Sequence, residues 1–158
     1  MKTTLLILLF IVISFVIYFF ILGMNSKSKD APSLINDHLS KCPETPNCFS
    51  TENKNHTGHY ISPIYISEEN RTNSDSLLIL KEIVQSMGGE IKTEKEHYFS
   101  STFTSNIFGF VDDLEIRMDN IERVIHIRSA SRVGKSDMGV NKKRIELIKQ
   151  FYTSKING

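Results

Sequence analysis

The order of apolar and polar positions divides the 158-residue chain into an apolar start and a mixed remainder. Leu5 to Leu22 is an 18-residue run that only one serine and one tyrosine interrupt. At about 1.5 Å per helical residue, such a run spans about 27 Å, close to the thickness of bilayer hydrocarbon. We therefore predict a transmembrane anchor over residues 1–24, a polar tether over residues 25–40 and a single domain over residues 41–158.

A cleaved signal peptide and a buried core helix are the alternatives for this run. The apolar region of a signal peptide usually has about 7–15 residues and ends in small residues of the A-x-A kind. The segment Gly23-Met24-Asn25-Ser26 lacks that pattern, and no cysteine follows it directly to mark a lipoprotein. We therefore expect the run to be retained as an anchor.

Helical spacing of apolar residues predicts two helices in the domain. The first follows Thr72 and Asp75, which resemble a capping box, and ends at Gly88-Gly89. The second follows Gly139 and has Asn141 as its predicted cap. The apolar positions are Leu77, Leu80, Ile83, Val84 and Met87 in the first helix, and Ile145, Ile148 and Phe151 or Tyr152 in the second.

Between these helices, runs of β-forming residues predict three or four strands, over residues 90–93, 97–104, 110–118 and 124–131. Residues 60–66 are also rich in β-formers, but Pro63 confines them to a sheet edge or an extended arm. The sequence therefore predicts an α+β fold: an antiparallel meander of about four strands with both helices packed on one face.

Alternation of apolar and polar residues within the last two strands predicts their register. A tight turn at Asn120-Ile121 would place Ile116 opposite Ile125 and Leu114 opposite Ile127, so that apolar side chains meet. On this register the polar pairs are Glu115 with His126, Asp113 with Arg128, and Asp112 with Ser129. A slip of one residue would turn the apolar side chains to the wrong face.

Basic residues concentrate in RSASRVGKSDMGVNKKR, residues 128–144, which holds six basic residues and one acidic residue. All 18 acidic residues and 18 of the 19 basic residues follow the apolar run, so this remainder has a formal net charge of zero. Broad nucleic-acid binding needs a basic domain. We therefore expect no nucleic-acid partner and treat the basic character as local.

The strongest candidate site combines this basic segment with the acidic strand before it. In one hypothesis the acidic side chains form a structural polar network with the basic ones; these acids are Asp112, Asp113, Glu115 and Asp137. In the other, the segment and the following helix start bind an anionic ligand, a lipid headgroup or an acidic protein segment. The residues of that hypothesis are Arg128, Ser129, Ser131, Arg132, Lys135, Asn141 and Arg144.

These features predict a membrane-anchored envelope protein that is a non-catalytic binding or assembly module. A hydrolase-like enzyme that uses Asp112 or Asp113 with Arg128 is the alternative. Residues 129–136 (SASRVGKS) imitate a nucleotide-binding loop, but a serine stands where the first glycine of that motif belongs. We expect no cofactor.

The two cysteines, Cys42 and Cys48, lie close together in CPETPNC, and we predict that they form a disulfide. A zinc set with His56 and His59 and a pair of free thiols are the alternatives. Structural zinc sites usually separate their cysteines by about two to four residues, whereas five intervene here. We therefore expect no metal. Because disulfides persist in oxidising compartments, we expect the domain on the extracytoplasmic, periplasmic side.

Three segments resemble the hallmark blocks of domain-of-unknown-function family 1499: CPETPNC, FGFVDDLEIRM and HIRSASRVGKSDMGVNKKRIE. The resemblance covers about Cys42 to Phe151, and the third block is long and specific. At Lys135, many relatives are expected to have an aromatic residue. The resemblance implies a family and no established activity.

Overall fold

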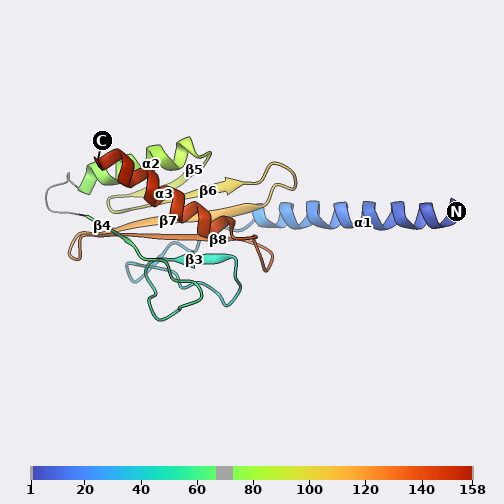
Figure 1. Ribbon diagram of the computed structural model, residues 1–158, viewed down its shortest axis with the longest axis horizontal. Helices are drawn as coiled ribbons and strands as arrows, with labels where there is room; N and C mark the ends of the chain where they lie inside the picture. The colour runs from blue at the N-terminus through green and yellow to red at the C-terminus, as the bar shows by residue number, and fades with distance from the viewer. Residues whose placement is uncertain (1, 67–72, 158) are drawn as a thin grey trace.

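The structure is a computed structural model that describes residues 2–66 and 73–157. Its first element, α1 (Lys2–Lys27), extends as a rod from one end of an α+β domain (Figure 1). The apolar side chains along most of α1 are exposed, which rules out a buried core helix. By length and composition α1 is suited to cross a membrane once, a property that N-terminal signal sequences share.

A six-stranded antiparallel sheet forms the centre of the domain. Four strands make the predicted meander: β5 (Glu90–Lys95), β6 (Tyr98–Thr104), β7 (Val111–Asp119) and β8 (Val124–Ser131). Two short strands, β3 (Cys48–Ser50) and β4 (Ile64–Tyr65), pair with different parts of β8 and complete that edge. Since β4 directly follows Pro63, the predicted edge segment is confirmed, as is the α+β class.

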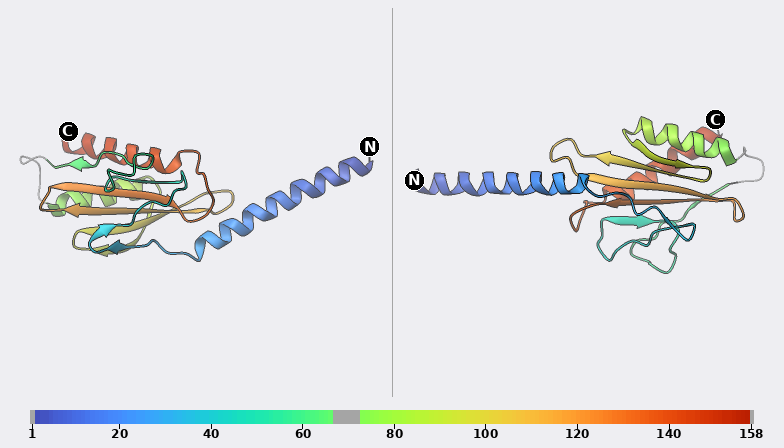
Figure 2. Two further views of the ribbon diagram at one scale, coloured as in Figure 1. Left: turned by 90° about the horizontal axis from the view of Figure 1, so that it is seen from below. Right: turned by 180° about the vertical axis from the view of Figure 1, so that it is seen from behind.

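Two helices, α2 (Asn73–Ser86) and α3 (Val140–Asn157), cover one face of this sheet (Figures 1 and 2). Their apolar stripes pack with the inward-facing residues of β6, β7 and β8 in one core, in which Leu80, Leu114 and Ile145 are completely buried. The predicted helices are therefore confirmed. Thr72 of the expected capping box lies outside the described residues.

The turn between β7 and β8 is longer than the sequence predicted. Residues 120–123 form the loop, and Asp119 pairs with Val124. The Asp119 carboxylate accepts hydrogen bonds from the backbone N–H groups of Ile121 and Glu122. Arg123 closes the loop with a φ of 54°, a conformation that the sequence did not reveal. The predicted two-residue turn is therefore wrong.

The predicted register is displaced by two residues as a consequence. The observed pairs are Ile116 with Ile127, Glu115 with Arg128, Asp113 with Ala130, and Asp112 with Ser131. Because side chains alternate with a period of two, this displacement keeps every residue on its predicted face. Ile116 still faces an isoleucine, but Leu114 faces Ser129, so the predicted apolar, charged and polar partners are all wrong.

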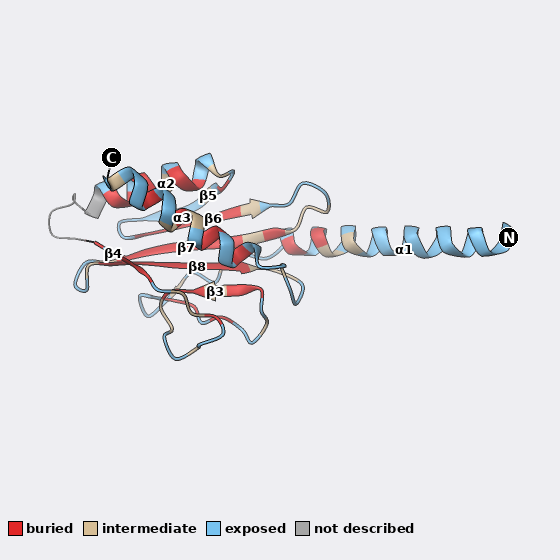
Figure 3. Cartoon of the chain, viewed as in Figure 1, coloured by how far each residue is buried: buried red, intermediate tan, exposed pale blue. Residues whose placement is uncertain are grey.

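The other face of the sheet carries charged and hydroxyl side chains, and segments from the first half of the domain cover it. Here β1 (Leu34–Ile35) and β2 (His38–Leu39) form a short hairpin within the range expected as a tether. The Leu39 N–H donates a hydrogen bond to the Glu52 carboxylate at 2.6 Å. Figure 3 shows buried residues along β7 and β8, so charged positions are enclosed as well as apolar ones.

Candidate functional site

On the helix-covered face, hydrogen bonds tie the end of β8 to the start of α3. Arg144 donates to Asp112 Oδ2 at 2.9 Å, to Ser129 Oγ at 2.9 Å and to Asn141 Oδ1 at 2.5 Å. Asn141 Nδ2 donates in turn to Ser131 Oγ at 3.0 Å. Ser129 and Asn141 are completely buried. These polar groups therefore satisfy one another inside the protein.

Asp137 caps the start of α3. Its carboxylate accepts hydrogen bonds from the backbone N–H groups of Gly139 at 3.1 Å and Asn141 at 2.6 Å. The prediction that Asn141 is the cap is wrong, because its side chain points into the buried network. A carboxylate of the chain itself thus occupies the helix start at which we expected an external anion.

Two further ion pairs lie on the opposite face. Glu115 is completely buried and accepts hydrogen bonds from Arg128 Nη1 and the Tyr98 hydroxyl, both at 2.9 Å. Burial raises the pKa of Glu115, and the Arg128 guanidinium opposes that rise. Arg132 holds the Asp113 carboxylate in a forked pair, through Nε at 3.0 Å and Nη2 at 2.8 Å.

The sheet therefore divides the predicted constellation into two groups. Successive residues of a strand point to opposite faces, so Asp112 separates from Asp113 and Ser129 separates from Arg128. The helix side holds Asp112, Ser129, Ser131, Asn141 and Arg144, with Asp137 at its rim; the other side holds Asp113, Glu115, Arg128 and Arg132. Lys135 is exposed in the loop and belongs to neither group.

Arg132 also joins the domain to the end of α1. We call the end of the sheet that meets α1 the proximal end; the loops of residues 105–110 and 132–139 lie there (Figure 2). Arg132 Nη1 donates to the backbone oxygen of Ser26 at 3.3 Å, and Lys29 Nζ donates to the backbone oxygen of Arg132 at 3.2 Å. The Val111 N–H donates to Ser26 Oγ at 3.0 Å. The basic segment therefore begins against the exit of the apolar helix.

Close packing reinforces this junction. A Cβ atom at Gly23 would lie 1.8 Å from the backbone oxygen of Phe108, so a side chain at this position would force the helix and the loop apart. The Phe108 ring lies 5.3 Å from the ring of Phe19 and 5.4 Å from that of Phe20, measured between centroids. The loop of residues 105–110 thus packs along the last turns of α1.

A polar cavity of about 750 Å³ opens beside the junction, on the charged face of the sheet. Its hydroxyl lining comes from Ser33, Thr93, Ser100, Thr102 and Thr104. Its charged lining includes the Arg132–Asp113 pair and Lys27, which extends from the end of α1. The proximal end therefore offers a hollow with hydrogen-bonding groups next to exposed basic residues.

A second polar cluster, which sequence reasoning missed, occupies the charged face nearer the β7–β8 turn. Glu52 accepts a hydrogen bond from Arg117 Nη2 at 2.6 Å, and its carboxylate lies 2.6 Å from His38 Nδ1. Burial lowers the pKa of His126 beside them; the Glu52 carboxylate opposes this shift, and the positive charge of Arg117 adds to it. The available signal was VDDLEIRMD, in which every second residue from Asp113 is charged, an unusual pattern for a central strand.

The cysteines form the predicted disulfide, Cys42–Cys48. The zinc set that would have used their sulfur atoms is therefore excluded. The backbone oxygen of Cys48 lies 2.8 Å from His59 Nδ1, which connects the disulfide loop to the turn that follows β3.

These features define an α+β domain joined through a packed junction to one long apolar N-terminal helix. The family model described as "Protein of unknown function (DUF1499)" matches residues 38–151, and the chain belongs to this family. The resemblance of the three sequence blocks is thereby confirmed. No curated protein matches the sequence.

Proposed function

We propose that the protein is a single-pass membrane protein whose extracytoplasmic domain lies on the bilayer and binds anionic headgroup phosphates there, without catalysis. The observation that carries the proposal is the junction between α1 and the proximal end. A signal peptide that is removed has no need of a fitted contact with the mature domain. Here Ser26, the last buried residue of α1, accepts hydrogen bonds from the Val111 N–H and from Arg132.

The position of the domain relative to a bilayer follows from helix geometry. If the apolar run is centred in the membrane, the hydrocarbon boundary about 15 Å from the centre falls close to Gly23. Phe19 and Phe20 then lie within the hydrocarbon, and Phe108, which packs on both, lies at the same depth. Ser26 and its partner Arg132 lie about 19 Å from the centre, at the level of the headgroups.

Exposed lysines at this level supply the binding charge. Lys27, Lys29 and Lys135 are exposed, whereas Arg128 and Arg144 are buried and paired with carboxylates. Anion binding at the proximal end therefore rests on the lysines, with Arg132 orienting the loop. Lys142 and Lys143 are exposed in the first turn of α3, where the helix dipole disfavours positive charge and an external anion would offset that cost.

The disulfide supports the extracytoplasmic side of the proposal, since cytosolic thiols are kept reduced. The hydrolase alternative required Arg128 beside Asp112 or Asp113. Arg128 instead pairs with Glu115, while Asp112 pairs with Arg144 and Asp113 with Arg132. No observation favours that activity, and we propose none.

Lipid selectivity of the full chain in nanodiscs tests the proposal. Spin-labelled phosphatidylglycerol and phosphatidylcholine report which headgroup is enriched beside the protein. A lysine near an anionic surface contributes about 1 kcal/mol, a factor of about five in association. We therefore expect the wild type to prefer phosphatidylglycerol. In the variant with Lys27, Lys29 and Lys135 changed to Gln, this preference should fall at least about fivefold.

The matched control changes three lysines at other surface positions, Lys54, Lys95 and Lys155, to Gln, which removes the same charge. This variant should keep the preference. An equal loss in both variants would mean that only net charge acts. Full retention of the preference in the proximal variant overturns headgroup binding, and an acidic protein segment would then be the remaining anionic partner. Competition by free inorganic phosphate separates a phosphate site from a bilayer-specific one.

A further inference from the structure

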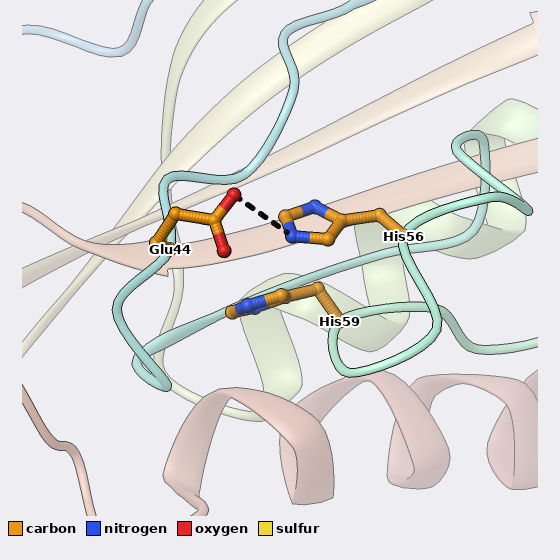
Figure 4. A group of neighbouring side chains, drawn as sticks. All are labelled: Glu44, His56 and His59. Atoms are coloured by element: carbon orange, nitrogen blue, oxygen red, sulfur yellow. Dashed lines mark ion pairs between the residues drawn. The ribbon is translucent and has the colours of Figure 1, made fainter.

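The two loops that flank β3 bring three metal-ligating side chains together. One potential ligand atom from each of Glu44, His56 and His59 lies within 4.8 Å of the others (Figure 4). Glu44 comes from the loop that the Cys42–Cys48 disulfide closes, and the two histidines come from the turn after β3.

His59 is held in an orientation suited to binding a metal. It is buried, and its Nδ1 lies 2.8 Å from the backbone oxygen of Cys48. Because a carbonyl oxygen only accepts, the neutral ring carries its proton on Nδ1, which leaves the lone pair on Nε2. Metal-binding histidines usually donate their second N–H to a carbonyl or carboxylate in this way, which fixes the tautomer and orients the ring.

His56 is placed next to His59 by a backbone turn. The His59 N–H donates to the His56 backbone oxygen at 2.9 Å, and the two ring centroids are 4.2 Å apart. His56 Nε2 lies 3.5 Å from a Glu44 carboxylate oxygen. Two imidazoles and a carboxylate thus face one space. A cation shared by the three groups would neutralise the carboxylate without requiring either ring to be protonated.

Small side-chain movements complete the coordination geometry. Ligand atoms about 2.1 Å from a tetrahedral ion are about 3.4 Å apart, so a group spread over 4.8 Å must contract slightly. The Glu44 side chain is 93% exposed and free to rotate inward, whereas buried His59 is fixed. The site is therefore built on a rigid histidine, with a mobile carboxylate to close it.

We propose that Glu44, His56 and His59 bind a divalent late transition-metal ion, such as Zn²⁺ or Cu²⁺. Imidazole nitrogen with one carboxylate suits these ions and not Ca²⁺ or Mg²⁺, which prefer oxygen ligands. Three protein ligands leave one tetrahedral position for water or a small ligand, as in exchangeable or catalytic sites and unlike closed structural ones. The disulfide serves this site by holding Glu44 in reach.

Zn²⁺ titration of the full chain in detergent micelles against a chromophoric chelator tests the proposal. The wild type, stripped of metal and with its disulfide intact, is expected to bind one equivalent. His56→Asn and Glu44→Gln alter exposed or half-exposed side chains and leave the His59–Cys48 contact intact. Each is expected to weaken binding at least about 10–100-fold, the loss seen even when only an outer partner of a ligand is removed.

His97→Asn is the matched control, because His97 also lies near a carboxylate, 3.6 Å from Glu96, on the surface of a tight turn. This variant should bind like the wild type. The absorption spectrum of bound Co²⁺ reports the ligand geometry independently and should change in the Glu44→Gln variant. Equal Zn²⁺ affinity in the wild type and in the His56→Asn and Glu44→Gln variants overturns the proposal.

A variant with both cysteines changed to Ser separates the contribution of the disulfide. Its loop is open, so the disulfide no longer holds the backbone at Glu44 near the two histidines, and the variant is expected to bind Zn²⁺ more weakly than the wild type. Unchanged affinity in this variant contradicts the role assigned to the disulfide. Circular dichroism of each variant confirms that the domain remains folded.

Discussion

The two faces of the β7–β8 hairpin are both buried, but one face buries apolar side chains and the other buries charged ones. One face carries isoleucines and leucines that pack under α2 and α3, such as Ile116 and Ile127. The other carries Glu115, Arg128, Arg117 and their partners, which are buried beneath short loops. Apolar packing stabilises in proportion to area, whereas buried charges stabilise only while they remain paired. The charged face should therefore be the more sensitive one to single substitutions.

The largest expected effect is the loss of one member of the Glu115–Arg128 pair. Arg128→Met leaves a buried carboxylate without its guanidinium and should destabilise the domain by about 3–5 kcal/mol. The measurement is urea unfolding of the full chain in micelles, followed by near-ultraviolet circular dichroism of the buried tyrosines. The double variant Glu115→Leu/Arg128→Met should recover most of the loss. A single variant within 1 kcal/mol of wild type, about one-third of the smallest expected loss, would contradict this view of the charged face.

Removal of apolar volume on the opposite face should cost somewhat less. Ile127→Ala creates a cavity where the side chain is completely buried, and we expect a loss of about 2–5 kcal/mol in the same unfolding assay. Ile127→Val should cost about 0.5–1.5 kcal/mol. The two faces would be distinguished by a loss of stability that scales with the volume removed at Ile127 and by a loss at Arg128 that the substitution of Glu115 recovers.

The cap of α3 should contribute a smaller amount. Asp137→Ala removes the acceptor for two backbone N–H groups and should destabilise the domain by about 0.5–2 kcal/mol. Ser136→Ala is the control, since Ser136 makes only a long 3.4 Å contact with the Met138 N–H. Equal stability of the two variants would show that Asp137 is not the cap.

The smallest effect is the pH dependence of the charged face. Burial lowers the pKa of His126, so the unfolded chain takes up a proton at a higher pH than the folded one. Stability should therefore fall as pH drops below about 6.5, with a slope of at most about 1.4 kcal/mol per pH unit. Unfolding curves between pH 5 and 8 should show this slope in the wild type and a flatter one in His126→Gln. Parallel curves would exclude His126 as the source.

Local patterns in the sequence predicted most of the fold. Helical spacing in α2 and α3 and β-forming runs in β5 to β8 gave the right elements, because each is long and strongly periodic. The short strands β3 and β4 have two or three residues and acquire order only by pairing with β8. The predicted register is wrong because the loop has four residues, 120–123, in place of two, and it closes at Arg123 in a left-handed backbone conformation.

The candidate sites were harder to predict because their contacts are distant in the sequence. Asn141 looks like a cap in a local reading, yet its buried partners come from β8. Arg117 donates a hydrogen bond to Glu52, 65 positions away in the sequence, and the Val111 N–H donates to Ser26, 85 positions away. The family resemblance and the disulfide were predictable, since both rest on short, specific motifs.

The proposed function depends on the placement of the proximal end on the bilayer, and spin-label depth measures this placement directly. Ile107 and Ile121 are both exposed, at 74% and 95%, but they lie in loops at opposite ends of the sheet. Each is changed to a labelled cysteine in the full chain in nanodiscs, and collisions with oxygen and with a water-soluble nickel complex are compared. A label at 107, next to Phe108, is expected within the bilayer, and a label at 121 is expected in water. Two labels equally accessible to the nickel complex would contradict it.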